Sequence, residues 1–133
     1  MEELKKRLYE AMLKKDAVVI IGETGIGKTS IVREFIEENG LSPINFLCNT
    51  YQKSTIGPYL EYDSKDYDVA FFDMFDCCNE EVREILFKEV KKCKERGLFV
   101  IATAWPTKHF GLEPISKERY SKYFDVIIEY KYY

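Results

Sequence analysis

A glycine-rich loop followed by a lysine and a threonine is the part of this sequence best suited to chemistry. The segment reads GETGIGKT and fits the spacing G-x-x-x-x-G-K-[ST]. In such a loop, successive backbone N–H groups can converge on a phosphate at the positive end of a helix. Lys28 is expected to reach the β- and γ-phosphates of a nucleotide, and Thr29 to offer its hydroxyl to Mg²⁺. The residues predicted to bind the nucleotide are Gly22, Glu23, Thr24, Gly25, Ile26, Gly27, Lys28, Thr29 and Ser30.

A phosphate site of this kind also needs an acid that holds Mg²⁺, usually at the end of a later apolar strand. Asp73 closes the apolar run VAFFD and is the candidate. The alternative is an aspartate that only caps a turn. We therefore predict Thr29 and Asp73 as the metal ligands, with ATP or ADP and Mg²⁺ as the cofactors.

The elements that position these residues follow from the apolar patterns. Short apolar runs predict strands, and apolar residues at helical spacing predict helices between them. The predicted strands are 17–21, 44–48, 68–73, 98–104 and 124–130, and the predicted helices are 2–14, the segment after the glycine loop, and Asn79 to about Arg96. Strands that alternate with helices indicate a parallel sheet covered on both faces. Residues 49–67 and 106–119 fit neither pattern and are predicted as loops.

Composition limits the class of protein. The 133 residues are predicted to form a single domain, 1–133, large enough to bury a core without disulfides. The formal net charge of −3 argues against direct contact with nucleic acid. No apolar run approaches the roughly 18 residues of a membrane helix, and the charged amino terminus differs from a secretory signal. A cytoplasmic protein without a membrane partner is expected.

The cysteines are expected to be free thiols. Adjacent Cys77 and Cys78 do not provide a C-x-x-C spacing, and the only histidine is His109, so a zinc site is disfavoured. Cys48 is expected to be the last residue of the predicted second strand, 44–48. Cys93 lies within KKCKER and is expected at the surface.

The order of these segments resembles the ATPase core of AAA+ proteins, most closely that of the bacterial enhancer-binding proteins that activate sigma-54 polymerase. VVIIGETGIGKTSIVREFI is similar to that family's VLITGETGTGKE segment, DVAFFDMFD occupies the place of its Walker B strand, and LFVIATA that of its sensor strand. The resemblance implies an α/β fold, a P-loop NTPase three-layer α/β/α sandwich with a five-stranded, mainly parallel sheet. It also implies that the helical lid domain and the sigma-contacting loop of that family are missing here.

The sequence departs from the family at the positions that serve hydrolysis. Met74 stands where the family has a glutamate that polarises water, and Ala104 stands where it has a sensor asparagine. Tyr123 replaces an arginine. The substitute catalytic residues that we predict are Asp76, Thr103, Lys122 and Arg119.

The leading interpretation is an ATP-binding AAA+-like P-loop domain with weak or partner-dependent hydrolysis, acting as a homo-oligomer or with a protein partner. One alternative is a nucleotide-gated interaction module in which the two loops present aromatic residues, namely Tyr51, Tyr59, Tyr62 or Trp105. Trp105 is otherwise expected to plug the sheet edge. Another alternative is a small nucleotide or metabolite kinase, although the arginines are few and scattered.

Overall fold

Five parallel strands form one sheet in the computed structural model, which describes residues 2–23 and 27–130. The strands are β1 (Ala17–Ile21), β2 (Pro43–Leu47), β3 (Val69–Asp73), β4 (Phe99–Ala104) and β5 (Val126–Glu129). Their order across the sheet is β2-β3-β4-β1-β5, and every neighbouring pair is parallel. The carboxyl ends of all five strands therefore lie along one edge of the sheet, where the glycine loop also begins.

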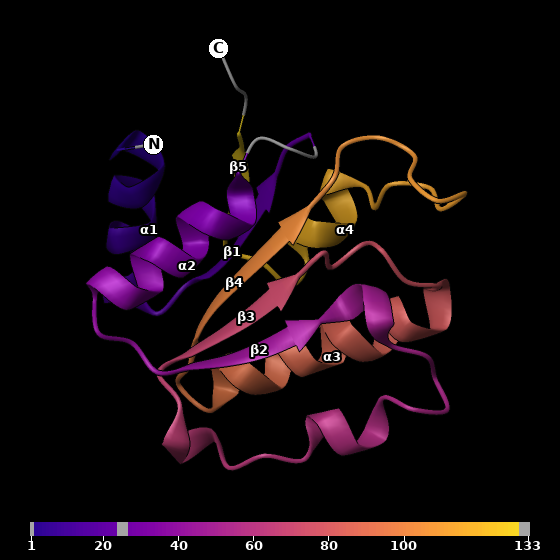
Figure 1. Cartoon of the computed structure of the whole chain (residues 1–133), viewed down its shortest axis with the longest axis horizontal. Helices are drawn as coiled ribbons and strands as arrows, with labels where there is room; N and C mark the ends of the chain where they lie inside the picture. Colours follow the sequence, from indigo (N-terminus) through magenta and orange to yellow (C-terminus); the bar gives the residue numbers. More distant parts are fainter. Residues whose placement is uncertain (1, 24–26, 131–133) are drawn as a thin grey trace.

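Helices cover both faces of this sheet. Helices α1 (Glu2–Lys14) and α2 (Lys28–Glu38) lie on one face, whereas α3 (Glu80–Glu95) and the short α4 (Lys117–Ser121) lie on the other (Figure 1). Successive residues of β1 alternate between the two cores: Val18 and Ile20 pack with α1 and α2, and Val19 packs with α3. Because both faces are covered, β1, β3 and β4 are buried along their whole length, which is why these segments are continuous apolar runs.

The predicted three-layer, five-stranded α/β fold is confirmed, with strand ends that differ from prediction by at most a few residues. Asn79 caps α3 as expected, since its side-chain oxygen accepts from the N–H of Val82 at 3.0 Å. Within 106–119 the structure differs, because α4 begins at Lys117 after a cap by Ser116. A helix of five residues is too short to produce a helical pattern in the sequence.

The predicted loop 49–67 lies at the surface with most of its residues exposed, and a few of its side chains pack inward. It contains three short 3₁₀ helices, η1 (Cys48–Thr50), η2 (Gly57–Leu60) and η3 (Ser64–Asp66). Tyr51 is only 6% exposed, and the Tyr62 hydroxyl donates to the buried carboxylate of Glu89 on α3. Of the tyrosines expected to meet a partner when nucleotide is bound, Tyr51 is buried here, whereas Tyr59 is exposed.

Two further expectations concern the cysteines and the membrane. All four cysteines are free, as predicted, but Cys93 is fully buried and not at the surface, and burial raises its thiol pKa to about 12. It lies on the side of α3 that faces the sheet, a position that the surrounding lysines conceal in the sequence. Among the described residues, no helix is both long enough and apolar enough to cross a bilayer.

Candidate nucleotide-binding site

The glycine loop connects β1 to α2 at the carboxyl edge of the sheet. At its start, the N–H of Gly22 donates to the carbonyl of Ala104 on β4 at 3.1 Å. At its end, Gly27 adopts a left-handed conformation, with φ of 80°, which glycine tolerates because it has no Cβ. Helix α2 then begins at Lys28, so that the first N–H groups of α2 face the cavity. The predicted ligands Thr24, Gly25 and Ile26 lie outside the described residues.

Lys28 is folded back onto the loop. Its side chain is largely buried, and its ammonium donates to the carbonyl oxygens of Gly22 at 2.6 Å and Glu23 at 2.9 Å. Burial lowers the pKa of this lysine, while the nearby carboxylates of Asp76 and Asp73 oppose that shift. A cation in this position can exchange the two carbonyl oxygens for phosphate oxygens over a short distance.

Asp73 connects the loop to the neighbouring strands. One carboxylate oxygen of Asp73 accepts from the hydroxyl of Thr29 at 2.9 Å and from the hydroxyl of Thr103 at 2.8 Å. Thr103 reaches Asp73 because β4, which carries it, pairs directly with β3. The three side chains supply only oxygen atoms, one of them from a carboxylate. This donor set fits Mg²⁺, which prefers one or two carboxylates and leaves its other positions to water and phosphates.

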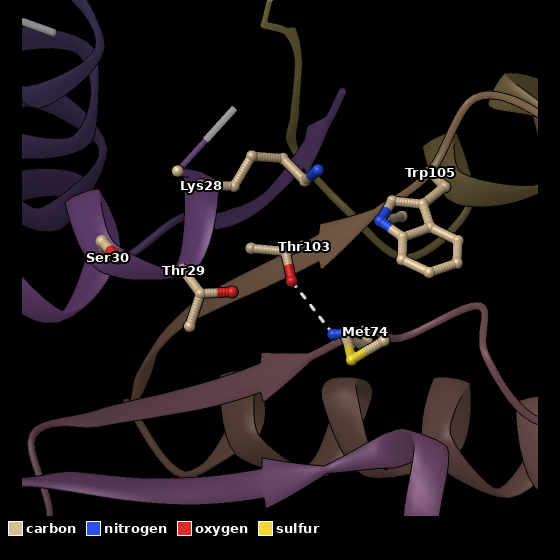
Figure 2. Close-up of a pocket in the computed structure, with 8 residues that line it drawn as sticks. Lys28, Thr29, Ser30, Met74, Thr103 and Trp105 are labelled. Atoms are coloured by element: carbon tan, nitrogen blue, oxygen red, sulfur yellow. Dashed lines mark hydrogen bonds between the residues drawn. The ribbon is translucent and has the colours of Figure 1, made fainter. Parts of the chain in front are cut away.

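A cavity of about 250 Å³ lies over these groups. Figure 2 shows Lys28, Thr29 and Ser30 on one side of it, facing Thr103, Met74 and Trp105 on the other. Gly27 and Ala104 are the other lining residues in the described part of the chain. The structure thus brings four of the predicted loop residues, Gly27 to Ser30, together with Thr103 and Trp105 around one cavity. Trp105 is nearly buried, so it is not presented as a free surface.

The position expected to hold a water-polarising acid is apolar. Met74 lines the cavity, and its N–H donates to the Thr103 hydroxyl at 3.0 Å (Figure 2). Met74 also has a φ of 57°, which is unusual for a residue with a side chain. Neither Met74 nor Ala104 can accept a proton from water. This side of the cavity therefore lacks a general base among its lining residues.

Asp76 is a second buried carboxylate, besides Asp73, that bonds to a residue of the cavity lining. It is 3% exposed, and it accepts from the N–H of Trp105 at 3.2 Å and from the thiol of Cys77 at 3.7 Å. Burial raises the pKa of Asp76, against the lowering effect of the Trp105 hydrogen bond. The contacts of Asp76 hold the backbone that follows β4.

The structure places Arg119 and Lys122 away from the cavity lining. Arg119, on α4, forms a two-pronged ion pair with Glu80 and a further contact with Glu84, both on α3. Lys122 lines a separate hollow together with Lys91, Lys94, Glu95 and Tyr123. Within one chain, these two predicted catalytic residues are not brought together with Lys28 and Asp73.

Arg83 is a positioning residue that the sequence does not reveal. One of its guanidinium nitrogens donates to the carbonyl of Asp76 and to that of Glu113, each at 2.7 Å. It thereby ties the turn after β3 to the segment that follows Trp105. In the sequence it lies within a charged helix and resembles any solvated arginine. What distinguishes Arg83 from a solvated arginine is its contact with both the turn after β3 and the segment after Trp105.

The fold defines the class of protein. A parallel sheet of this strand order, with a glycine loop between β1 and α2, is typical of an AAA+-like P-loop NTPase. Solved structures support this class. RuvB, the Holliday junction branch migration motor of Thermotoga maritima, aligns with a TM-score of 0.68 and 22% identity over 100% of this chain and 46% of its own. AMPPCP-bound DnaA from Aquifex aeolicus aligns with a TM-score of 0.67 and 16% identity over 95% of this chain and 44% of its own.

The family follows from the sequence comparison. The model of the family described as threonylcarbamoyl adenosine biosynthesis protein TsaE matches residues 1–131, nearly the whole chain. This chain therefore belongs to the TsaE family. No curated protein matches. The chain spans less than half the length of the solved structures cited above, which at these identities show the fold alone.

These comparisons refine the resemblance drawn from the sequence. The AAA+-like P-loop core is confirmed, and the chain is a nucleotide-binding P-loop domain. The closer resemblance to sigma-54 activators, and with it a role in transcription regulation, is not supported by the family found.

Proposed function

We propose that this chain binds ATP or ADP together with Mg²⁺ in the P-loop cavity and acts as a nucleotide-dependent component of threonylcarbamoyl adenosine biosynthesis. One observation carries the nucleotide part: Asp73 accepts from both Thr29 and Thr103 beside the start of α2. The family match is the reason for the biosynthetic part. Transcription activation through sigma-54 has no comparable support.

Each residue has a task in this proposal. Lys28 gives up its bonds to Gly22 and Glu23 and pairs with phosphate oxygens, while the N–H groups at the start of α2 donate to the same phosphates. Thr29 and Asp73 hold Mg²⁺, which neutralises phosphate charge when bound. Ser30 and Thr103 supply hydroxyls from opposite sides of the cavity.

We further propose that hydrolysis by the isolated chain is slow and that a protein partner or a second copy accelerates it. A positioned base contributes about 10²–10⁴-fold to such a reaction, and a cation at the developing charge about 10³–10⁵-fold. Met74 cannot act as that base. Asp76 is the candidate for the general base, with Thr103 as a polar sensor. Lys122 and Arg119 lie away from the cavity of their own chain, so they could act only on the cavity of a neighbouring chain.

A second candidate function, a nucleotide-gated interaction module, is favoured by the position of Lys28. Because the Lys28 ammonium is bonded to two loop carbonyls here, pairing with a phosphate would release these carbonyls and alter the contacts within the loop. Trp105 lines the same cavity and contacts the segment that follows β4, so the rearrangement can reach the surface. In this second candidate function, the chain signals that a nucleotide is bound without hydrolysing it.

Calorimetry of Mg-ATP and Mg-ADP binding tests the nucleotide proposal. Replacing Lys28 with alanine removes charge-assisted hydrogen bonds, and we expect affinity to fall about 10- to 100-fold. Lys6→Ala, which removes an exposed lysine on α1, is the matched control and should bind as the wild type does. The fluorescence of Trp105, the single tryptophan, provides a second readout at the cavity itself. Equal affinity of the Lys28→Ala and Lys6→Ala variants would refute the proposal.

A further inference from the structure

The segment after β4 ends in a tight turn that we call the finger, residues 106–113. His109 and Leu112 pair across it, with N–H to carbonyl distances of 3.0 and 2.8 Å. Phe110 and Gly111 between them have φ values of 50° and 75°. Two central residues with positive φ define a type I′ turn, in which asparagine, aspartate or glycine is strongly preferred at the first position.

Phenylalanine is a poor choice for the fold at this position. A bulky residue with positive φ is strained, and Phe110 is 80% exposed, so little burial offsets the strain. Its ring touches Trp105, at a centroid distance of 5.9 Å, without being covered by it. The strain and the exposure together indicate that the side chain is held out for an external contact.

The base of the finger is fixed. Asp76 accepts from the N–H of Trp105 at one end, and Arg83 donates to the carbonyl of Glu113 at the other. Both anchors are buried, so Phe110 is presented in one defined place. A pre-organised apolar group loses little conformational entropy when it docks.

A complementary hollow lies at the opposite edge of the sheet. Its volume is about 320 Å³, and its apolar wall consists of Ile36, Leu41 and Pro43, where α2 ends and β2 begins. Arg33, Glu37 and Asn45 supply the rest of the lining. The finger follows the carboxyl end of β4, whereas the hollow adjoins the amino end of β2. In a parallel sheet these ends are opposite, so a finger cannot reach the hollow of its own chain (Figure 1).

We propose that Phe110 of one copy docks into this hollow on a second copy, giving a head-to-tail association of chains. The charges are complementary: Lys108 and Glu113 flank Phe110, and Glu37 and Arg33 flank the hollow. On docking, the exposed Lys108–Glu113 pair opens, and its members pair with Glu37 and Arg33 of the second copy. The docking does not depend on the proposed nucleotide function, because neither surface contains a residue of the P-loop cavity.

A single aromatic knob with two ion pairs forms a small contact. Such contacts are weak, so we expect dissociation constants on the order of 100 µM. Because knob and hollow lie on different parts of the chain, the contact is heterologous and each added copy leaves another knob and another hollow free. Association therefore grows with concentration and is weakened by salt.

Sedimentation velocity over about 10–500 µM tests this docking. The wild type should show a weight-average mass that rises with concentration. Phe110→Asn places the preferred residue in the type I′ turn, so it should fold at least as well, yet its association should weaken by about tenfold or more. Leu13→Asn is the matched control, because Leu13 is another largely exposed apolar side chain, on α1. Its association should equal that of the wild type.

Charge reversal and mixing identify the surfaces. Glu37→Lys should repel Lys108 and weaken association about tenfold, and adding Lys108→Glu in the same chain should restore it. Alone, Phe110→Asn and Glu37→Lys should each associate about tenfold more weakly than the wild type. A mixture of the two should form one-to-one dimers, because the knob of the Glu37→Lys chain meets an intact hollow on the Phe110→Asn chain.

A wild type that stays monomeric throughout the range would overturn the proposal, as would association that Phe110→Asn leaves unchanged. Lys28→Ala should associate as the wild type does. The outcome for docking is therefore separate from the outcome for nucleotide binding.

Discussion

The two sides of the P-loop cavity differ in kind. On the side of Lys28, Thr29 and Asp73, polar groups are connected by hydrogen bonds of 2.6–2.9 Å and are ready to meet a phosphate and a metal ion. On the side of Met74 and Ala104, the lining has no acid or base. Binding of a nucleotide and its hydrolysis depend on different residues. Under the proposed function, nucleotide binding therefore does not require the groups that would speed hydrolysis.

The largest effect is expected on the binding side. Replacing Asp73 with asparagine keeps an oxygen that accepts from Thr29 and Thr103 but removes the negative charge that holds Mg²⁺. We expect the Mg²⁺-dependent part of ATP affinity to fall about 100-fold. Affinity in the presence of a chelator should change little, which is the internal control. Calorimetry with and without Mg²⁺ makes the comparison, and equal losses under both conditions would contradict the metal role.

The next largest effect is expected from adding an acid to the Met74 side of the cavity. Met74→Glu adds a carboxylate to the cavity opposite Thr29, and we expect phosphate release from Mg-ATP to rise about tenfold. Met74→Gln has a similar shape without a basic group and should not raise the rate. If the two variants released phosphate equally fast, the missing base would not be what limits hydrolysis.

A smaller effect concerns Asp76, whose pKa is raised by burial from its ordinary value of 3.8. The folded protein holds this proton more tightly than the unfolded chain, so stability is lost as pH rises through the folded pKa. Asp76→Asn removes this loss and should raise the melting temperature by a few degrees at pH 7. The gain should shrink as pH falls towards 4. A gain that is independent of pH would show that Asp76 is not the titrating group.

The smallest effect on turnover is expected at Arg119. Because its guanidinium is engaged by Glu80 and Glu84, Arg119→Ala should change phosphate release by no more than about twofold at low protein concentration. It should lower the melting temperature slightly, since α4 loses its contact with α3. Arg119→Lys retains the charge but not the two-pronged geometry and serves as the control. A loss of about 10³-fold would instead identify an arginine that acts on a neighbouring cavity.

Much of the site is local in the sequence, and those parts were predictable. The spacing of Gly22, Gly27 and Lys28 defines the loop, and the end of an apolar strand indicates Asp73. The three central strands, β1, β3 and β4, are continuous apolar runs because both faces of the sheet are covered there. In contrast, α4 is too short to show a pattern.

The rest depended on distant contacts. The burial of Cys93 could not be recognised from its lysine-rich surroundings, since only the rotation of α3 about its axis decides which face meets the sheet. Arg83 acquires its positioning role because it bonds both to Asp76 in the preceding turn and to Glu113, which is thirty residues away in the chain. Tyr51 is buried because the segment 49–67 folds back over α3 and β2.

By itself, the sequence determined the class of fold, the phosphate loop and the absence of an acid at position 74, because each depends on neighbouring residues or on the period of a single element. The tertiary structure alone decided that Thr103 meets Asp73, that Arg119 turns to α3, and that Phe110 stands out from a strained turn. These outcomes depend on the order of the strands and on loop packing, which join residues some thirty positions apart.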